Sequence, residues 1–364
     1  MRKIFSVITA VLIAFSLSTE SFAAAKSAVL IDSESGRVLF EHNKDEKLPM
    51  ASTTKIMTAL IVLEEENIDE YFSVKKSDIA VEGSSMGLLP GDKVTLRILA
   101  SGMLLASGND AANAAAIRIS GSVENFVKLM NKRAKEMGLR NTSFETPSGL
   151  DGKNHFSTAY DMALLAKNAM KNPIFKEICG SESLRMEFGN PPYKRTLSNH
   201  NRLLKTFEGA TGIKTGFTKK SGRCLVSSAE REGVSLICVT LGCPDDWNYH
   251  TALYNEYFGK LESVPLEKLA KEKLIPVCGG TEKTVKAVPK NVSASLFKGE
   301  EERITVVISA EPFVFAPVKK GKILGKALFY LDGELIAETP LAAEKTVEKV
   351  PGSERFWDNI KDNF

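Results

Sequence analysis

The sequence has few of the residues on which metal sites and most serine hydrolases depend. Its 364 residues include only four histidines and five cysteines. The cysteines lack the paired C-x-x-C spacing of a zinc site, and no H-E-x-x-H motif indicates a metal-dependent peptidase. No histidine stands in a G-x-S-x-G or similar serine-hydrolase motif. We therefore expect neither a metal nor a cofactor, and a catalytic serine would need a base other than histidine.

Charge of one sign is also scarce. The formal net charge is +3, and the chain contains no run of five or six like charges. This balance gives no reason to expect a nucleic-acid partner. The length and an ordinary apolar fraction of 43% favour a folded protein of about two domains.

Long apolar runs are absent beyond the N-terminus, where two cations precede an apolar stretch over residues 4–17. That stretch is shorter than the about 20 residues that span a bilayer, and small residues follow it. The order is typical of a secretory signal over residues 1–25, cleaved after Ala23 or Ala25. An uncleaved anchor or a buried helix would fit the same apolar stretch. We expect export, and a mature protein that acts outside the cytoplasm.

The odd number of cysteines leaves at least one outside any disulfide within the chain. Cys224 and Cys238 lie on two apolar runs that flank a turn, so they could face one another across a hairpin. Buried free thiols are the interpretation we favour.

Strand patterns at both ends of the first 260 or so residues enclose a mainly helical middle. Residues 28–43 predict two short strands around a Ser-Gly turn, and strand patterns return over residues 212–242. Helices are predicted where apolar residues recur at intervals of three and four, in residues 54–66, 97–119, 124–139 and 156–172. Strands distant in sequence must then share one sheet, which predicts an α/β or α+β domain over residues 26–261.

The composition shifts after about Pro265. Short strand patterns with little helix predict a small all-β domain over residues 262–350. Asp332-Gly333, between two alternating runs, is a strong hairpin signal.

The last segment, residues 351–364, is amphipathic. On a helix it would place four apolar residues on one face: Phe356, Trp357, Ile360 and Phe364. Such a helix could lie in a membrane interface. A helix packed on the β domain, or a frayed tail, would fit the same pattern.

Ser52 and Lys55 stand three residues apart at the start of a long apolar helical pattern. The S-x-x-K spacing occurs three times in the chain, but only here does such a pattern follow it. On a helix, positions i and i+3 share one face and lie within side-chain reach. Taken alone, the pair fits a helix cap and a solvated lysine better than a nucleophile and its base.

Two further motifs change that interpretation. A Ser-Gly-Asn sequence at residues 107–109 lies where two helical stretches meet, and Lys-Thr-Gly at residues 214–216 lies on a predicted strand. Alone, the first could be a helix break and the second a solvated lysine beside a bulge glycine. In this order, however, the three motifs are similar to S-x-x-K, S-D-N and K-T-G, the signature of penicillin-binding proteins and serine β-lactamases.

With these motifs, residues 27 to about 260 resemble the low-molecular-mass penicillin-binding proteins that are serine-type D-alanyl-D-alanine carboxypeptidases. The stretches that carry the resemblance are residues 51–60, 84–112, 155–166 and 201–229. The middle motif is Ser-Gly-Asn, as is usual in that family, rather than Ser-Asp-Asn. The resemblance implies an α/β (α+β) β-lactamase/DD-peptidase-like domain, with an antiparallel sheet, packed helices and a helical subdomain. The β domain and the amphipathic end match the family more loosely.

Serine chemistry and the resemblance together suggest the catalytic roles. A serine hydroxyl needs an adjacent base, and a lysine can serve if burial and a second cation lower its pKa. Lys55 enters a buried helix, and the resemblance brings Lys214 close to it. We expect Ser52 to be the nucleophile that forms the acyl-enzyme and Lys55 to be its general base. Ser107 would relay the proton to the leaving amine, and Asn109 would hold Lys55 and the substrate amide.

The implied substrate is a peptidoglycan stem peptide that ends in D-Ala-D-Ala with a free carboxylate. Lys214 would supply positive charge, and the Thr215 hydroxyl would bond the carboxylate. Gly216 would let the substrate backbone approach as an added strand. The oxyanion hole of the family would be the backbone N–H groups of Ser52 and Phe217.

Several reactions share this site. Water attack on the acyl-enzyme gives a carboxypeptidase, attack by an amine gives a transpeptidase, and a D,D-endopeptidase or a β-lactamase would use the same serine. No E-x-x-L-N-like segment follows residue 109 to activate water as in many β-lactamases. We expect a carboxypeptidase that β-lactams acylate, peripheral on the outer face of the cytoplasmic membrane. Arg202 is a possible second partner for the carboxylate, although a structural role fits it better.

Overall fold

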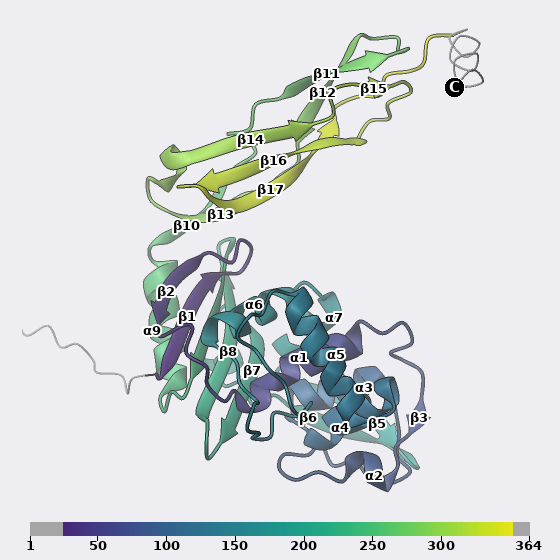
Figure 1. Cartoon of the computed structure of the whole chain (residues 1–364), viewed down its shortest axis with the longest axis vertical. Helices are drawn as coiled ribbons and strands as arrows, with labels where there is room; N and C mark the ends of the chain where they lie inside the picture. The colour runs from purple at the N-terminus through teal and green to yellow at the C-terminus, as the bar shows by residue number, and fades with distance from the viewer. Residues whose placement is uncertain (1–24, 352–364) are drawn as a thin grey trace, which may run out of the picture.

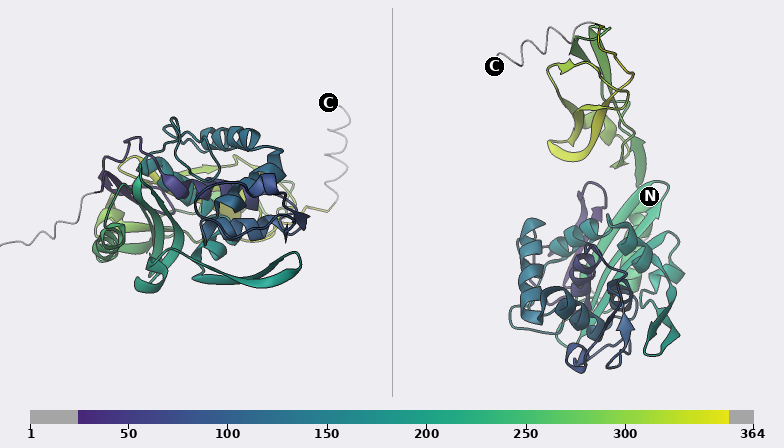
Figure 2. Two further views of the ribbon diagram at one scale, coloured as in Figure 1. Left: turned by 90° about the horizontal axis from the view of Figure 1, so that it is seen from below. Right: turned by 90° about the vertical axis from the view of Figure 1, so that its right-hand side faces the viewer.

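The computed structural model describes residues 25–351, in two parts arranged along one long axis (Figure 1). The larger part contains the helices, and the smaller is a β-domain at one end (Figures 1 and 2). All but the last residue of the expected signal peptide, and all but the first residue of the amphipathic segment, lie outside the described residues. Within residues 25–351, no helix is both long enough and apolar enough to cross a membrane.

A five-stranded antiparallel sheet forms the centre of the larger part, with strand order β2-β1-β9-β8-β7. The strands are β1 (Ser27–Asp32), β2 (Val38–His42), β7 (Ala210–Thr218), β8 (Gly222–Arg231) and β9 (Val234–Leu241). The first two strands therefore join three that follow about 170 residues later, as the strand patterns at both ends predict. β7 is at one edge of the sheet.

Helices cover both faces of this sheet, and further helices pack on them. The helices of the larger part are α1 (Lys55–Leu63), α2 (Lys76–Ile79), α3 (Leu96–Leu104), α4 (Asn109–Ser120), α5 (Val123–Glu136), α6 (Ala159–Ala169), α7 (Pro173–Gly180), α8 (Leu203–Thr206) and α9 (Asp246–Phe258). Successive residues of β1 alternate between the faces: Val29 and Ile31 pack in the cluster with α1, whereas Leu30 packs with α9. All nine residues of α1 are buried, so it is the central helix of the larger part.

The fold class predicted from the sequence is confirmed, with some local corrections. Thr158 caps α6, because its side chain accepts a hydrogen bond from the backbone N–H of Asp161. This helix ends at Ala169, before the predicted end at residue 172, and Pro173 opens the next helix. The single helix predicted over residues 97–119 is divided into α3 and α4 by a break at residues 105–108.

A second, four-stranded sheet lies beside the helices with the order β3-β4-β5-β6. Its strands are β3 (Phe72–Ser73), β4 (Lys93–Val94), β5 (Ser183–Gly189) and β6 (Pro192–Ser198). The long β5–β6 hairpin was not predicted from the sequence. Alternate residues of β5 are apolar and pack toward the core (Leu184, Met186 and Phe188), but β6 is mostly exposed and has no such alternation, so only one of the two strands carries a strand pattern.

The smaller part is all-β, apart from a 3-10 turn, and has its own core. A six-stranded sheet has the order β14-β16-β17-β12-β11-β15, and β10 pairs with β13. The elements are β10 (Leu261–Pro265), β11 (Lys273–Cys278), β12 (Thr284–Pro289), β13 (Ser293–Phe297), the 3-10 turn η2 (Glu300–Arg303), β14 (Ile304–Ala310), β15 (Val314–Phe315), β16 (Ile323–Leu331) and β17 (Glu334–Ala343). The predicted Asp332-Gly333 hairpin joins β16 to β17, with Leu331 opposite Glu334.

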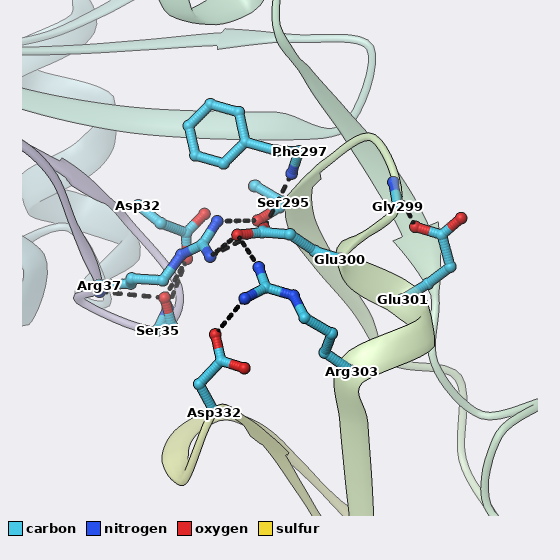
Figure 3. Close-up of polar contacts among 10 residues, drawn as sticks. All are labelled: Asp32, Ser35, Arg37, Ser295, Phe297, Gly299, Glu300, Glu301, Arg303 and Asp332. Carbon is cyan, nitrogen blue, oxygen red and sulfur yellow. Dashed lines mark hydrogen bonds and ion pairs between the residues drawn. The ribbon is translucent and has the colours of Figure 1, made fainter.

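An arginine from the β1–β2 turn ties the two parts together (Figure 3). One terminal nitrogen of Arg37 donates to both carboxylate oxygens of Glu300, at 2.9 and 2.8 Å, and the other donates to the Ser295 carbonyl at 3.1 Å. Arg303 approaches the same carboxylate at 3.2 Å from within the β-domain. Phe297 adds an edge-on ring contact with Tyr257 of α9, with ring centroids 6.2 Å apart.

None of the five cysteines, all within the described residues, forms a disulfide. In the β8–β9 hairpin, Cys224 lies opposite Leu241 and Cys238 opposite Ser227. The two thiols therefore do not face one another, and the disulfide alternative is wrong because the register separates them. Four of the five cysteines are buried and Cys278 is half-buried.

Candidate active site

Ser52 lies in a single 3-10 turn, η1 (Ala51–Thr54), that leads directly into α1. No side chain caps η1 or α1; the Thr53 hydroxyl instead donates to the Met50 carbonyl at 2.6 Å. The cap interpretation of this stretch is therefore wrong. Because the turn continues into α1, Ser52 and Lys55 share one face, and Lys55 Nζ lies 3.0 Å from Ser52 Oγ.

The Lys55 ammonium is fully buried and has three neutral oxygen partners. Its Nζ contacts Ser52 Oγ, donates to Asn109 Oδ1 at 2.7 Å and donates to the backbone carbonyl of Ser148 at 2.6 Å. No carboxylate is within ion-pair distance of Nζ among the residues that the structure describes. A buried lysine held only by dipoles is poorly stabilised as a cation.

The pKa of Lys55 is accordingly lowered well below its ordinary value. Burial is the largest cause, and the positive charge of Lys214 lowers the pKa further. Asp110 opposes the shift as the weaker influence. The site therefore favours the neutral amine, which is the form that can accept a proton.

Ser107 and Asn109 come from the junction of α3 and α4. Asn109 is the first residue of α4, and its Nδ2 donates to the Glu82 carbonyl at 2.6 Å, which leaves Oδ1 facing Lys55. Ser107 has a φ of +58°, a left-handed conformation that is uncommon outside glycine. The Ser-Gly-Asn sequence is thus a break between two helices, and the break also turns polar side chains toward Ser52.

Lys214 lies on the edge strand β7 and is buried. Its Nζ donates to the Thr215 carbonyl at 2.9 Å, and burial lowers the pKa of Lys214 to about 7. The positive charge near the cavity therefore depends on a group that titrates close to neutral pH.

At Gly216, β7 passes close to the turn that carries Ser52. A Cβ on Gly216 would lie 3.0 Å from the Ser52 backbone nitrogen and 3.1 Å from the Met50 carbonyl oxygen. A side chain here would push the strand away from η1. Phe217, the next residue, has a side chain that is 65% exposed.

A cavity of about 310 Å³ brings the three motifs together. It is lined by Ser52, Ser84, Ser107, His200, Thr215, Gly216, Phe217, Arg223, Asp246 and Trp247. Lys55, Asn109 and Lys214 are not lining residues but are buried close to its wall. The structure thus places all eight residues named from the sequence around one cavity.

Two backbone features near Ser52 were missed by sequence reasoning. The Ser148 carbonyl is a partner of Lys55, and Gly149 packs so tightly under η1 that a Cβ would lie 1.9 Å from the Ala51 carbonyl oxygen. Both belong to the P-S-G-L stretch between the motifs. A backbone carbonyl has no residue-type signature, so this stretch was the only available signal.

Arg223, which was not named from the sequence, lines the cavity, whereas Arg202 does not. Arg202 is exposed at the start of α8 and does not line the cavity. Arg223 does: it lies opposite Phe217 in the β7–β8 pairing, donates to Asp246 at 2.6 Å and lies over the Trp247 ring at 5.3 Å. Only the strand register reveals Arg223 as a cavity residue.

The buried histidines have structural partners. His155 accepts from the Glu145 backbone N–H at 2.9 Å and contacts Thr54 Oγ1 at 2.8 Å, and burial lowers its pKa to about 4. Burial likewise lowers the pKa of His250 to about 3. His200 alone lines the cavity, and burial and then Lys214 lower its pKa. Within residues 25–351, no group of three or more His, Cys, Asp or Glu residues is placed to hold a metal ion.

Comparison with known proteins agrees with this geometry. Residues 15–245 match the family described as D-alanyl-D-alanine carboxypeptidase, and residues 265–349 match the penicillin-binding protein 5 C-terminal domain. The chain is 39% identical over 340 residues to the D-alanyl-D-alanine carboxypeptidase DacF of Bacillus subtilis, covering 89% of this chain and 86% of that one. It is 36% identical over 361 residues to DacC of Escherichia coli, covering 93% and 88%.

Solved structures give the same assignment. Penicillin-binding protein 5 from Haemophilus influenzae is 30% identical, with a TM-score of 0.68 over 89% of this chain and 98% of that one. DacD from Francisella tularensis is 30% identical, with a TM-score of 0.66 over 90% and 94%. One assignment follows from the serine beside a buried lysine, from the two further motifs around the same cavity and from these similarities. The chain belongs to the D-alanyl-D-alanine carboxypeptidase family of penicillin-binding proteins, and it is a serine-type hydrolase of the cell wall.

Proposed function

We propose that the chain removes the terminal D-alanine of peptidoglycan stem pentapeptides through an acyl-enzyme on Ser52. The observation that carries this proposal is the 3.0 Å contact between Ser52 Oγ and a buried Lys55 that has no carboxylate partner within residues 25–351. When Lys55 is neutral, the Ser52 hydroxyl donates to Nζ, and the amine can take the proton as Oγ attacks.

In the acylation step, Ser52 Oγ attacks the carbonyl carbon of the penultimate D-alanine. The backbone N–H groups of Ser52 and Phe217 receive the oxyanion. The proton held by Lys55 passes through the Ser107 hydroxyl to the leaving nitrogen as the C–N bond breaks. In deacylation, Lys55 accepts a proton from water, the resulting hydroxide attacks the ester, and the same proton returns to Ser52 Oγ as it leaves.

Substrate binding falls to the edge strand in this proposal. Protonated Lys214 and the Thr215 hydroxyl hold the terminal carboxylate, and the peptide backbone lies along β7 beside Gly216. Asn109 keeps Lys55 in place through Oδ1, and its second Nδ2 hydrogen is available to the substrate amide.

The serine mechanism is tested with a labelled penicillin and a pentapeptide substrate. Ser52→Ala should abolish both the covalent label and the release of D-alanine, while the neighbouring Thr53→Ser should keep the label. Mass spectrometry of the products should show loss of one D-alanine and no cross-linked dimer. D-alanine release that persists in Ser52→Ala would contradict the nucleophile assignment, and a cross-linked product would indicate transpeptidation instead.

We also propose the division of the chain and its place in the cell. Residues 1–25 are a cleaved signal, residues 26–261 the catalytic domain, residues 262–350 the β-domain and residues 351–364 an interfacial membrane anchor. The order of charges and apolar residues at the N-terminus supports export. The amphipathic pattern of the last segment supports a peripheral location on the outer face of the cytoplasmic membrane.

Deletion of residues 351–364 tests the anchor. Because the segment is separate in sequence from every cavity residue, the truncated protein should be released from membranes with its kcat/KM for a soluble pentapeptide unchanged. Membrane fractionation and a D-alanine release assay measure the two outcomes. A truncated protein that stays fully membrane-bound would show that another part of the chain is the anchor.

A further inference from the structure

The end of the β-domain far from the catalytic domain exposes an unusual group of apolar and basic side chains. In the segment of residues 311–323, Phe313 is 48% exposed, Phe315 is 53% exposed and Ile323 is 50% exposed. The two phenylalanine rings contact one another edge to face, with centroids 5.6 Å apart. A pair of large rings is thus directed toward solvent.

The backbone of this segment is held firmly in place. Val314 and Val318 are buried in the core of the β-domain, and Val314 pairs with Val277 in the parallel β11–β15 contact. Because side chains alternate along a strand, burial of Val314 places Phe313 and Phe315 on the outer side. The exposure of the two rings follows from the fold and does not depend on a loose loop.

Three lysines follow the two rings within the same segment. Lys319, Lys320 and Lys322 are exposed, and none of them makes an ion pair with a described residue. Their turn is fixed by the backbone, since the Lys320 N–H donates to Thr346 Oγ1 and the Lys322 N–H donates to the Lys319 carbonyl. With Glu311 as its single acidic residue, the segment of residues 311–323 has a net charge of +2.

The chain reaches its C-terminal segment at this same end. Val347 bridges to Val318, and the Val350 N–H donates to the Gly279 carbonyl at 2.9 Å, next to the strand that pairs with β15. The described part of the chain therefore ends, at Pro351, on the same side of the β-domain as the exposed rings. The catalytic domain lies at the other end of the long axis (Figure 1).

We propose that Phe313, Phe315, Lys319, Lys320 and Lys322, here called the apolar-basic tip, form a second membrane contact. The tip would bind the headgroup region of an anionic bilayer. Aromatic rings are favourable at the boundary between headgroups and acyl chains, and lysines beside them are attracted to lipid phosphates. The proposal rests on the proposed location of the protein at a membrane, and it adds a contact that residues 351–364 do not supply. Two contacts at one end would fix the orientation of the long axis relative to the bilayer and hold the active site away from the lipid.

The test is partition onto vesicles of phosphatidylglycerol or phosphatidylcholine, with the full chain and with the chain that lacks residues 351–364. Phe313→Ser/Phe315→Ser should lower the partition coefficient on phosphatidylglycerol by about tenfold or more in both chains. Changing the three lysines to glutamine should cost about fivefold per lysine at low salt and much less at high salt. Phosphatidylcholine vesicles should bind weakly.

Leu335→Ser and Lys298→Gln are the matched controls. Leu335 is 46% exposed and Lys298 is exposed, and both lie in the β-domain near its contact with the catalytic domain. Neither should change partition, and all variants should keep wild-type kcat/KM on a soluble pentapeptide. If the tip variants partition as wild type in both chains, the proposal is overturned and the anchor alone explains binding. If the full chain and the truncated chain bind equally, and the tip substitutions remove binding from both, the membrane contact of the tip is supported and the anchor proposal fails.

Discussion

Lys55 and Lys214 are two buried lysines beside one cavity, and their roles require opposite protonation states. Lys55 must be neutral to accept the Ser52 proton, whereas Lys214 must be charged to attract a carboxylate. Burial lowers the pKa of both, and the charge on Lys214 also lowers the pKa of Lys55. Each lysine therefore works only within a limited pH range.

The pH dependence of kcat/KM follows from the pKa of Lys214. Above about 7 the free enzyme loses the Lys214 charge, so kcat/KM for a pentapeptide should fall as pH rises. Lys214→Arg keeps its charge throughout this range, and the falling limb should disappear even if the maximum is lower. His200 does not account for the limb, because burial lowers its pKa below the ordinary value of 6.5. A limb unchanged in Lys214→Arg would show that another group causes it.

The turn η1 that carries Ser52 is held between two close backbone contacts. Gly216 of β7 lies against it on one side, and Gly149 lies against the Ala51 carbonyl on the other. The position of the nucleophile is therefore set by packing of backbone on backbone, where even one methyl group does not fit.

Gly149→Ala should displace η1 and lower the acylation rate by a labelled penicillin by at least about tenfold. Its Cβ would lie 1.9 Å from the Ala51 carbonyl oxygen, and its φ is +87°. Gly91→Ala is the matched control, because Gly91 has a φ of +91° but nothing within 4 Å of an added Cβ. Both variants should lose about 1 kcal/mol of unfolding free energy to backbone strain, and only Gly149→Ala should lose further stability and acylation rate. Equal effects in the two variants would contradict the packing argument.

The sequence predicts those parts of the site that depend on residue type and local spacing. Ser52 and Lys55 are three residues apart, so a helical turn brings them together without any tertiary information. The Ser148 carbonyl and Arg223 depend on tertiary packing and on strand register, which the sequence pattern does not specify. The β5–β6 hairpin was missed for another reason: β5 alternates apolar and polar residues, but the mostly exposed β6 does not, so the sequence lacks the pair of strand patterns that indicates a hairpin.

At the scale of the whole molecule, the Glu300 carboxylate receives arginines from both parts. The Glu300 side chain is 11% exposed and receives Arg37 from the catalytic domain and Arg303 from its own domain (Figure 3). It also accepts the backbone N–H of Phe297 at 2.9 Å. Loss of Arg37 leaves Glu300 with one cation, whereas loss of the Glu300 charge leaves Arg37 without its counter-ion.

Glu300→Gln should therefore destabilise the protein more than Arg37→Gln. We expect a loss of about 2–3 kcal/mol in unfolding free energy for Glu300→Gln and about half as much for Arg37→Gln, measured by urea denaturation. Asp69→Asn is the control: it breaks the pair with Arg97, in which the side chains are 65% and 33% exposed, and should cost less than about 1 kcal/mol.

Small-angle scattering should show a broader distribution of inter-domain distances in Glu300→Gln, while kcat/KM on a soluble pentapeptide stays unchanged because the pair lies outside the cavity. If Glu300→Gln leaves both the scattering and the denaturation curve as in the wild type, the arginine–glutamate contact does not set the orientation of the two domains.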